Sequence, residues 1–431
     1  MKRFALYALV FQLCALLALG FPRVVTHLQG NLQMPPVAAR LLLPDGFSNR
    51  LYADSAERFA QQGDKDIGGF MRAFQAEVHI AAVRYIDGPG VERTAYPYIS
   101  HFNMQYALGK WLTFGSPSFA RAGVVAFQLL CITAMSLVVA GMALFARNWH
   151  GRGAGVAVFL AFALSPAMLA RAASPYWVIA LHFLPFVATL WLYPRMRSGR
   201  GLAALAGLLA LLTCLKALTG YEYMSNIVLG PMLAVLYHEL RAHPRFDVAL
   251  LRVLVFRGAA LGAGCVAGFG IAVGLHVWKA AMFFGSLRQG VEAFLLPLTY
   301  SVASSASGIR SEVAVAPLRL LRQTAVTFVT MNPIVSLPLY GGLVLCLLLL
   351  LARSRWSVPR VWSSLDGRQR ALWVTLLASI PASLSWIILA QRHSAVHPHI
   401  NWVLAYMYLN VFAAMALADM VARLRRRGPA E

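Results

Sequence analysis

The chain has 431 residues, of which 59% are hydrophobic and only 13% are charged, and its mean hydropathy is +0.64. Because soluble domains carry about 25% charged residues, this composition excludes an ordinary water-soluble domain. A disordered chain, a collagen-like fibre and a disulfide-stapled secreted scaffold are excluded as well. We therefore expect an all-α polytopic membrane protein whose partner is the lipid bilayer.

The formal net charge is +22, from 38 Lys and Arg against 16 Asp and Glu. Short clusters of basic residues lie between the apolar segments: Arg147 and Arg152; Arg195, Arg197 and Arg200; Arg241 and Arg245; Arg353, Arg355 and Arg360; Arg423 to Arg427. Cytoplasmic loops of membrane proteins are enriched in Lys and Arg in this way. This distribution favours a membrane protein, and we expect no nucleic-acid partner. The five cysteines lie in apolar stretches without CxxC spacing, which is typical of buried apolar side chains.

Ten segments are long and apolar enough to span a bilayer. The first is Phe4 to Phe21, directly after Met1, Lys2 and Arg3. A cleaved signal peptide is the alternative to an uncleaved anchor, and the lack of an A-x-A site before Phe21 favours the anchor. The other nine are 122–146, 154–170, 176–193, 202–218, 224–240, 258–278, 326–352, 371–390 and 402–422. Ten spans place both termini in the cytoplasm.

This topology divides the chain into five parts. They are the anchor (1–21), a large outer loop (22–121), spans two to seven (122–278), a second outer segment (279–325), and spans eight to ten with a basic cytoplasmic tail (326–431). The large loop holds 8 of the 16 acids. Its spacing of apolar residues between Phe70 and Tyr85 predicts a helix that lies in the membrane interface. Because the acids lie outside, we expect the protein to act on its outer side.

Lys216 stands at the outer end of the apolar segment 202–218, and Glu222 follows two residues after Gly220. Ionisable residues at membrane depth are costly, and they are usually functional or paired. Either the two charges neutralise each other, or Lys216 extends to the membrane surface, or both residues bind a substrate, which is the interpretation we favour. Tyr221 is a further candidate substrate contact, with an ordinary interfacial aromatic residue as the alternative.

The turn between the last two spans, residues 391–401, is unusually polar for this chain. It contains Arg392, His393, His397 and His399. Guanidinium and imidazole groups can hold a phosphate or pyrophosphate through charge-assisted hydrogen bonds. A transition-metal site is the rival interpretation, but the histidines lack i, i+4 helical spacing and no carboxylate lies close in sequence. We predict phosphate contacts and no metal site here, with an ordinary polar turn as the remaining alternative.

Three short stretches look like segments of bacterial membrane glycosyltransferases of surface-polysaccharide type: Pro97 to Gln105, Leu218 to Tyr223, and His393 to Asn401. An anchor, a large acidic outer loop with interfacial helices and a bundle of further spans together resemble the plan of the GT-C superfamily. The resemblance covers most of the chain. It implies an enzyme at the periplasmic face of a bacterial inner membrane that transfers a sugar from a polyprenyl-phosphate carrier to a glycan or lipid-linked acceptor.

The resemblance also implies roles for the residues that carry it. By position after the first span, Asp54, and next Asp45, resemble the acid that deprotonates the acceptor hydroxyl. Asp54 is equally explained as the cap of a short helix, and the two roles are compatible. The stretch Asp64-Lys65-Asp66 is similar to the metal-binding DxD of some members, so a divalent metal stays open as a cofactor, although a solvated loop explains it more simply.

The donor phosphate would be held by Lys216, Arg392 and His397, while Glu222 and His399 would orient the substrate. A polymerase or ligase of lipid-linked glycan needs the same groups and is a close alternative. A flippase or transporter of lipid-linked sugar is the alternative from another class, and the scarcity of charges in mid-span disfavours it. The chain contains no GxxxxGK[ST], HExxH or GxSxG motif.

Overall fold

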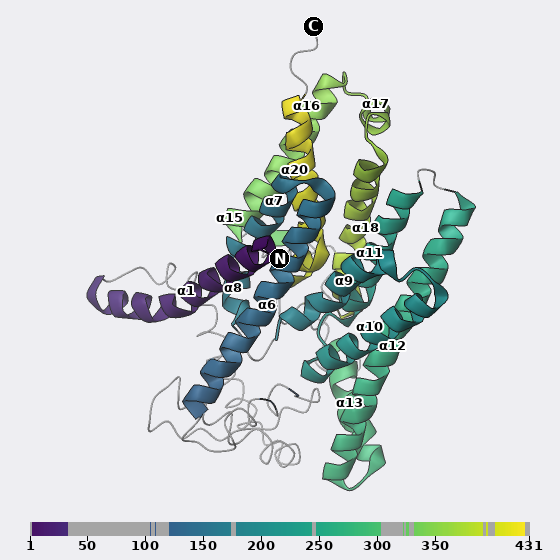
Figure 1. The fold of residues 1–431 in the computed structure, drawn as a ribbon. Coiled ribbons are helices and arrows are strands. Elements are labelled where there is room, and N and C mark those ends of the chain that lie inside the picture. Colours follow the sequence, from purple (N-terminus) through teal and green to yellow (C-terminus); the bar gives the residue numbers. More distant parts are fainter. Residues whose placement is uncertain are drawn as a thin grey trace.

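The computed structural model describes residues 2–32, 104, 108, 120–173, 178–243, 247–302, 322, 325–326, 332–390, 394 and 401–426. Every regular element in these ranges is helical, and no strand occurs in them. The prediction of an all-α protein is therefore confirmed for the described part of the chain. The long helices from α6 onward pack side by side in one bundle (Figure 1).

The first half of the described chain forms α1 (Lys2–Leu32), α6 (Ala120–His150), α7 (Arg152–Ala163), α8 (Pro166–Ala172), α9 (Ala180–Leu192), the single turn η2 (Tyr193–Arg195), α10 (Gly199–Thr219) and α11 (Met224–Ala242). The second half forms α12 (Val248–Phe284), α13 (Leu287–Val302), α15 (Pro333–Ser336), η3 (Leu337–Gly341), α16 (Gly342–Arg353), α17 (Val358–Ser363), α18 (Gly367–Leu389), η5 (Ala405–Leu409) and α20 (Asn410–Arg426). The segments η3 and η5 are single π-helical turns inside longer helices.

Six helical segments of the described chain are long and apolar enough to cross a membrane: Ala126–His150, Gly199–Thr219, Val248–Met282, Pro333–Arg353, Gly367–Leu389 and Ala405–Arg425. Each coincides with a span expected from the sequence, so the chain is built as a multi-pass membrane protein. The other four expected spans correspond to α1, to α7 with α8, to α9 and to α11. The full count of ten spans and the large outer loop stay predictions, because most of residues 33–119 lie outside the described part.

The expected span 154–170 is broken in two. The helix α7 ends at Ala163, and α8 begins at Pro166. Pro166 has no backbone N–H to donate, and the Ser165 hydroxyl accepts a hydrogen bond from the backbone N–H of Met168 at 3.1 Å. Proline at the first position and serine at the cap are a helix-start signal, and this signal overrides the continuous apolar run.

The helices α10 and α12 run parallel and touch through small residues. A Cβ at Gly264 would lie against the carbonyl oxygen of Ala206, and a Cβ at Gly268 against that of Ala210, in both cases closer than atoms can approach. Glycine at these two positions lets the backbones meet, as small residues do in membrane-embedded helix pairs. Beyond Gly285, whose φ of 73° ends α12, the helix α13 folds back along α12. This places the C-terminal end of α12 beside α10 and α13.

The two ends of the bundle differ in chemistry. We call the basic end the one where α6 and α11 finish and α18 begins, which lies at the top of Figure 1. There the Arg241 guanidinium stacks 3.7 Å from the Trp149 ring, and Arg368 donates to the Trp149 carbonyl oxygen at 2.9 Å. Asp366 and Gln369 form a capping box at the start of α18. We call the opposite end, where α10 finishes and α11 begins, the polar end.

Candidate functional site

Three of the residues predicted to bind substrate, Lys216, Tyr221 and Glu222, lie in the described chain, at the polar end of the bundle. The other predicted site residues lie outside it: Asp45, Asp54, Arg392, His393, His397 and His399. Their roles therefore stay predictions. Lys216, Tyr221, Glu222 and the side chains around them form the candidate site.

The turn between α10 and α11, residues 220–223, holds the three side chains. The Lys216 ammonium donates a hydrogen bond to the Gly220 carbonyl oxygen at 2.6 Å, which closes the end of α10. Gly220 has extended backbone, and a Cβ there would collide with the Glu222 carboxylate. Tyr223 takes a left-handed conformation (φ 62°) and starts α11. A side chain at position 220 would therefore push the Glu222 carboxylate away from its present place, and glycine leaves that place open.

Lys216 and Glu222 form an ion pair, with Lys216 Nζ 3.7 Å from Glu222 Oε2. The lysine side chain is 1% exposed and the glutamate 13%. Lys216 therefore does not extend to the membrane surface. The two charges therefore neutralise each other, which is one of the three interpretations of the sequence. Glu222 can still bind a further group, because it keeps an exposed edge and a carboxylate accepts more than one hydrogen bond.

Aromatic and basic side chains from three other helices surround the pair. The Tyr223 ring lies 5.9 Å from the ring of His182 on α9 and 5.7 Å from that of Trp386 on α18. His182 interacts electrostatically with Lys216, and Tyr223 interacts with both Glu222 and Arg171 on α8. Burial raises the pKa of the Tyr223 phenol, and the nearby Glu222 charge raises it further. The phenol is therefore a neutral hydrogen-bonding group.

Charged side chains gather around the turn. Arg171 and Lys216 are both buried, with relative exposure of 6% and 1%, and Glu222 lies within ion-pair distance of Lys216. The charges of Glu222 and Arg171 both act on the Tyr223 phenol. Buried charged groups at the end of an apolar span are usually functional or paired, and cations held there can bind an anionic group. Arg171 of α8 is part of this cluster.

Tyr221 points away from the ion pair, toward α12. Its hydroxyl lies 2.7 Å from Nδ1 of the buried His276. Its ring packs edge-on against Phe269 of α12 and Phe294 of α13, at centroid distances of 5.6 and 5.7 Å. Burial raises the pKa of the Tyr221 phenol. Tyr221 thus ties the turn to α12 and α13, and its role as a substrate contact stays a prediction.

Asn226, one turn into α11, is a polar junction that the sequence reasoning did not identify. Its amide nitrogen donates to the backbone carbonyl oxygens of Ala382 and Ser383 on α18, at 3.0 and 3.2 Å, and lies 2.9 Å from the hydroxyl oxygen of Tyr408 in η5. The signal was present, because an asparagine in the apolar segment 224–240 has to find partners. Asn226 holds together the three helices that flank the pair.

The polar turn 391–401 is represented by two described residues, Ser394 and Asn401, and both are buried. The Asn401 side chain donates to the Ser394 carbonyl oxygen at 3.0 Å. Asn401 opens the segment that leads into η5, whose Tyr408 contacts Asn226. The described parts of this turn therefore face the protein interior, next to the helices that carry the candidate site.

Chemically, the cluster can bind an anion through its cations and can orient hydroxyl groups through Glu222. In the described ranges, no three His, Cys, Asp or Glu side chains gather in a way that could hold a metal ion. Comparisons of the chain with protein families, with curated proteins and with solved structures give no match.

Proposed function

We propose that this protein is a GT-C-like membrane glycosyltransferase that moves a sugar from a polyprenyl-phosphate carrier to a lipid-linked or surface glycan. The observation that carries the proposal is the ion pair of the buried Lys216 with Glu222 at the polar end, with the buried Arg171 near the same turn. Ammonium and guanidinium groups in such a place can bind a lipid phosphate. The hydrophobic tail of such a lipid can lie in the surrounding bilayer, so the protein needs no separate pocket for it.

The orientation of the bundle supports an active face on the periplasmic side. Basic clusters gather at the basic end, which the enrichment of cytoplasmic loops in Lys and Arg assigns to the cytoplasm. The Lys216–Glu222 pair lies at the opposite end, which we therefore assign to the periplasm of a bacterial inner membrane. Polyprenyl-phosphate sugars used on that side present their phosphate at the headgroup level, and the α10–α11 turn lies at the end of a candidate span.

Each group has one role in the proposed reaction. A carboxylate from the large outer loop, Asp54 or Asp45, takes the proton from the acceptor hydroxyl. The resulting oxygen attacks the anomeric carbon, and the bond from that carbon to the phosphate oxygen breaks with inversion. The phosphate leaves with the bonding electrons, and cations stabilise its new charge. Lys216 and Arg171 supply those cations, and Glu222 orients a sugar hydroxyl or a divalent cation.

The turn 391–401 adds further phosphate contacts in this proposal. Arg392, His393 and His397 would bind phosphate oxygens, and His399 would orient the sugar. The burial of Ser394 and Asn401 supports a turn that faces the interior. A polymerase or ligase of lipid-linked glycan would use the same groups on a larger donor, so the donor and acceptor used in the experiment decide between these reactions.

The test is a transfer assay in proteoliposomes with radiolabelled polyprenyl-phosphate hexoses and a lipid-linked acceptor extract. We expect Glu222→Gln and Asp54→Asn each to abolish formation of the labelled product. The matched control is Glu292→Gln, which makes the same chemical change at an exposed glutamate of α13 and should leave transfer intact. Product formation at the wild-type rate in both site variants would reject the proposed site.

The same vesicles test the rival function. If the wild-type protein moves the intact labelled lipid across the bilayer and no sugar is transferred, the protein is a flippase and the glycosyltransferase proposal is wrong. If label appears in the product only when a preassembled oligosaccharide lipid is supplied, the polymerase or ligase reaction is the correct one.

A further inference from the structure

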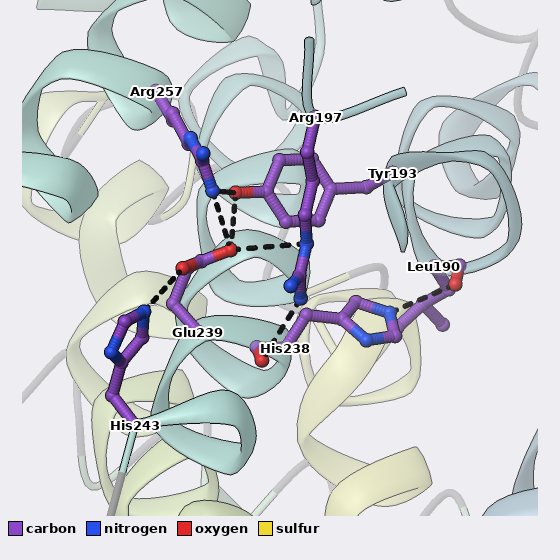
Figure 2. A network of polar contacts seen from close by, with 7 residues as sticks. All are labelled: Leu190, Tyr193, Arg197, His238, Glu239, His243 and Arg257. Atoms are coloured by element: carbon purple, nitrogen blue, oxygen red, sulfur yellow. Dashed lines mark hydrogen bonds and ion pairs between the residues drawn. The ribbon is translucent and has the colours of Figure 1, made fainter. Parts of the chain in front are cut away.

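A second charged cluster lies at the basic end, between η2, α11 and α12 (Figure 2). Its centre is Glu239, whose side chain is 1% exposed. Oε1 of Glu239 accepts hydrogen bonds from the Tyr193 hydroxyl at 2.7 Å and from Arg257 Nη1 at 2.8 Å, and it lies 3.3 Å from Arg197 Nε. His243 Nε2 lies 3.4 Å from the other oxygen. One buried carboxylate thus holds two guanidinium groups within a few ångströms of each other.

The cluster carries more positive than negative charge. Glu239 neutralises one guanidinium, and the charge of the second remains. The Tyr193 hydroxyl donates its hydrogen to Glu239 and adds no charge of its own. Both guanidinium groups lie near the Tyr193 ring, 5.5 and 6.0 Å from its centroid. Arg197 is 34% and Arg257 24% exposed, so an anion can reach both of them from outside.

The position of Arg257 along α12 sets the depth of the cluster. The next charged residue on this helix is Lys279, 22 positions further along. At 1.5 Å per residue the two charges are about 33 Å apart, close to the roughly 30 Å thickness of the bilayer core. A bilayer core that has Lys279 at one boundary therefore has Arg257 at the other, close to the lipid headgroups on the basic side.

Apolar side chains beside the cluster face outward. Phe256 is 71% and Val255 62% exposed, on a helix long and apolar enough to span the membrane. In a bilayer such side chains contact acyl chains. An anion that binds Arg197 and Arg257 thus lies next to an apolar surface. The acyl chains of a lipid can contact this surface, whereas a free phosphate cannot.

We propose that Arg197 and Arg257 form a binding site for the phosphate of an anionic phospholipid in the leaflet at the basic end. In the described chain Arg257 engages Glu239 and Tyr193 through Nη1 alone, and Arg197 uses Nε and Nη2. Each guanidinium keeps at least one further N–H to donate, and Glu239 holds both in place. Basic sites between membrane helices on the cytoplasmic side bind phospholipid headgroups by this chemistry. The inference is independent of the proposed transferase activity.

The test measures lipid binding to the full-length protein in detergent by native mass spectrometry. Phosphatidylglycerol is the probe, phosphatidylcholine is the uncharged comparison, and glycerol 3-phosphate is the soluble phosphate. We expect Arg197→Gln and Arg257→Gln each to weaken phosphatidylglycerol binding about tenfold, as the loss of a charge-assisted hydrogen bond predicts. The matched control is Arg252→Gln, which removes the same charge from an exposed position of α12 and should weaken binding by less than about threefold.

Glu239→Gln tests whether the cluster binds lipid or only holds the helices together. It removes the competing negative charge, so we expect phosphatidylglycerol to bind at least as tightly as it does to the wild type, although the variant unfolds at a lower temperature. If Arg257→Gln does not fold, Arg257→Lys keeps the charge but loses the planar fork, and it should bind more weakly than the wild type.

Three results would overturn the proposal. Equal losses in Arg252→Gln and Arg257→Gln would show that the whole basic surface attracts lipid. Binding of glycerol 3-phosphate as tight as that of phosphatidylglycerol would show a site for a free phosphate. Loss of lipid binding in Glu239→Gln to the level of Arg257→Gln would show that the cluster only holds the helices together.

Discussion

The Lys216–Glu222 pair gives a quantitative prediction about stability. The charged atoms are 3.7 Å apart, and at an effective dielectric constant of about 20 their Coulomb attraction is roughly 4 kcal/mol before desolvation is subtracted. Glu222→Gln removes the acid and leaves the ammonium of Lys216, 1% exposed, with its hydrogen bond to the Gly220 carbonyl oxygen at 2.6 Å. Because removing one member of a buried pair costs about 3–5 kcal/mol, and Glu222 is partly exposed, we expect a loss of about 2–3 kcal/mol.

The double variant Lys216→Met/Glu222→Gln removes the isolated charge as well. Methionine fills a similar volume with a flexible apolar chain, so the double variant should be more stable than the sum of the single losses predicts, by about 2 kcal/mol of coupling. The assay is reversible unfolding in mixed micelles, with the free energy of unfolding measured for each variant. Glu292→Gln is the control for the chemical change, and we expect no measurable effect from it.

If the losses of the single variants Lys216→Met and Glu222→Gln add up to the loss of the double variant within about 0.5 kcal/mol, the two charges do not interact in the folded protein. That result would contradict the ion pair on which the candidate site rests. A large coupling with intact transferase activity in the double variant would show a purely structural ion pair and would refute the role proposed for Glu222.

Further predictions concern the helices that position the two clusters. Gly268→Ala should destabilise the protein by about 2 kcal/mol or more because its Cβ would meet the Ala210 backbone of α10, whereas Gly270→Ala, with open space around it, should be neutral or slightly stabilising in the same unfolding assay. Asn226→Leu should cost about 2–4 kcal/mol, since it strips hydrogen bonds from two helices in a buried site, and an unchanged melting temperature would contradict the junction. Asp366→Ala should lower the free energy of unfolding by about 1 kcal/mol, because the cap at the start of α18 is lost. Asparagine caps nearly as well as aspartate, so an equal decrease in Asp366→Asn would argue against the cap.

The sequence predicted the membrane class and six of the spans because long apolar runs have few alternative explanations. It did not predict the break between α7 and α8, where a local Ser-Pro signal interrupts an apolar run. It also did not predict the π-helical turns of η3 and η5, since one extra residue per turn hardly changes the spacing of a segment that is apolar on all sides.

For the candidate site, the sequence identified Lys216 and Glu222 because charges next to an apolar span are rare. It did not give the direction of their neighbour Tyr221, which turns toward His276 on α12. Alternate residues of a tight turn point to different helices, and which helix receives each side chain depends on contacts between distant segments. Arg171 and Asn226 were missed or discounted for the same reason, since their partners lie on other helices.

Photo-crosslinking of the carrier tests the central claim most directly. A polyprenyl phosphate with a diazirine next to its phosphate is bound to the full-length protein, irradiated, and the labelled peptides are identified by mass spectrometry. We expect labelling of the peptide that contains the α10–α11 turn. Unlabelled polyprenyl phosphate should reduce this labelling, and Lys216→Met should abolish it. Labelling confined to the basic end, around Arg197 and Arg257, would contradict an active cluster at Lys216 and Glu222.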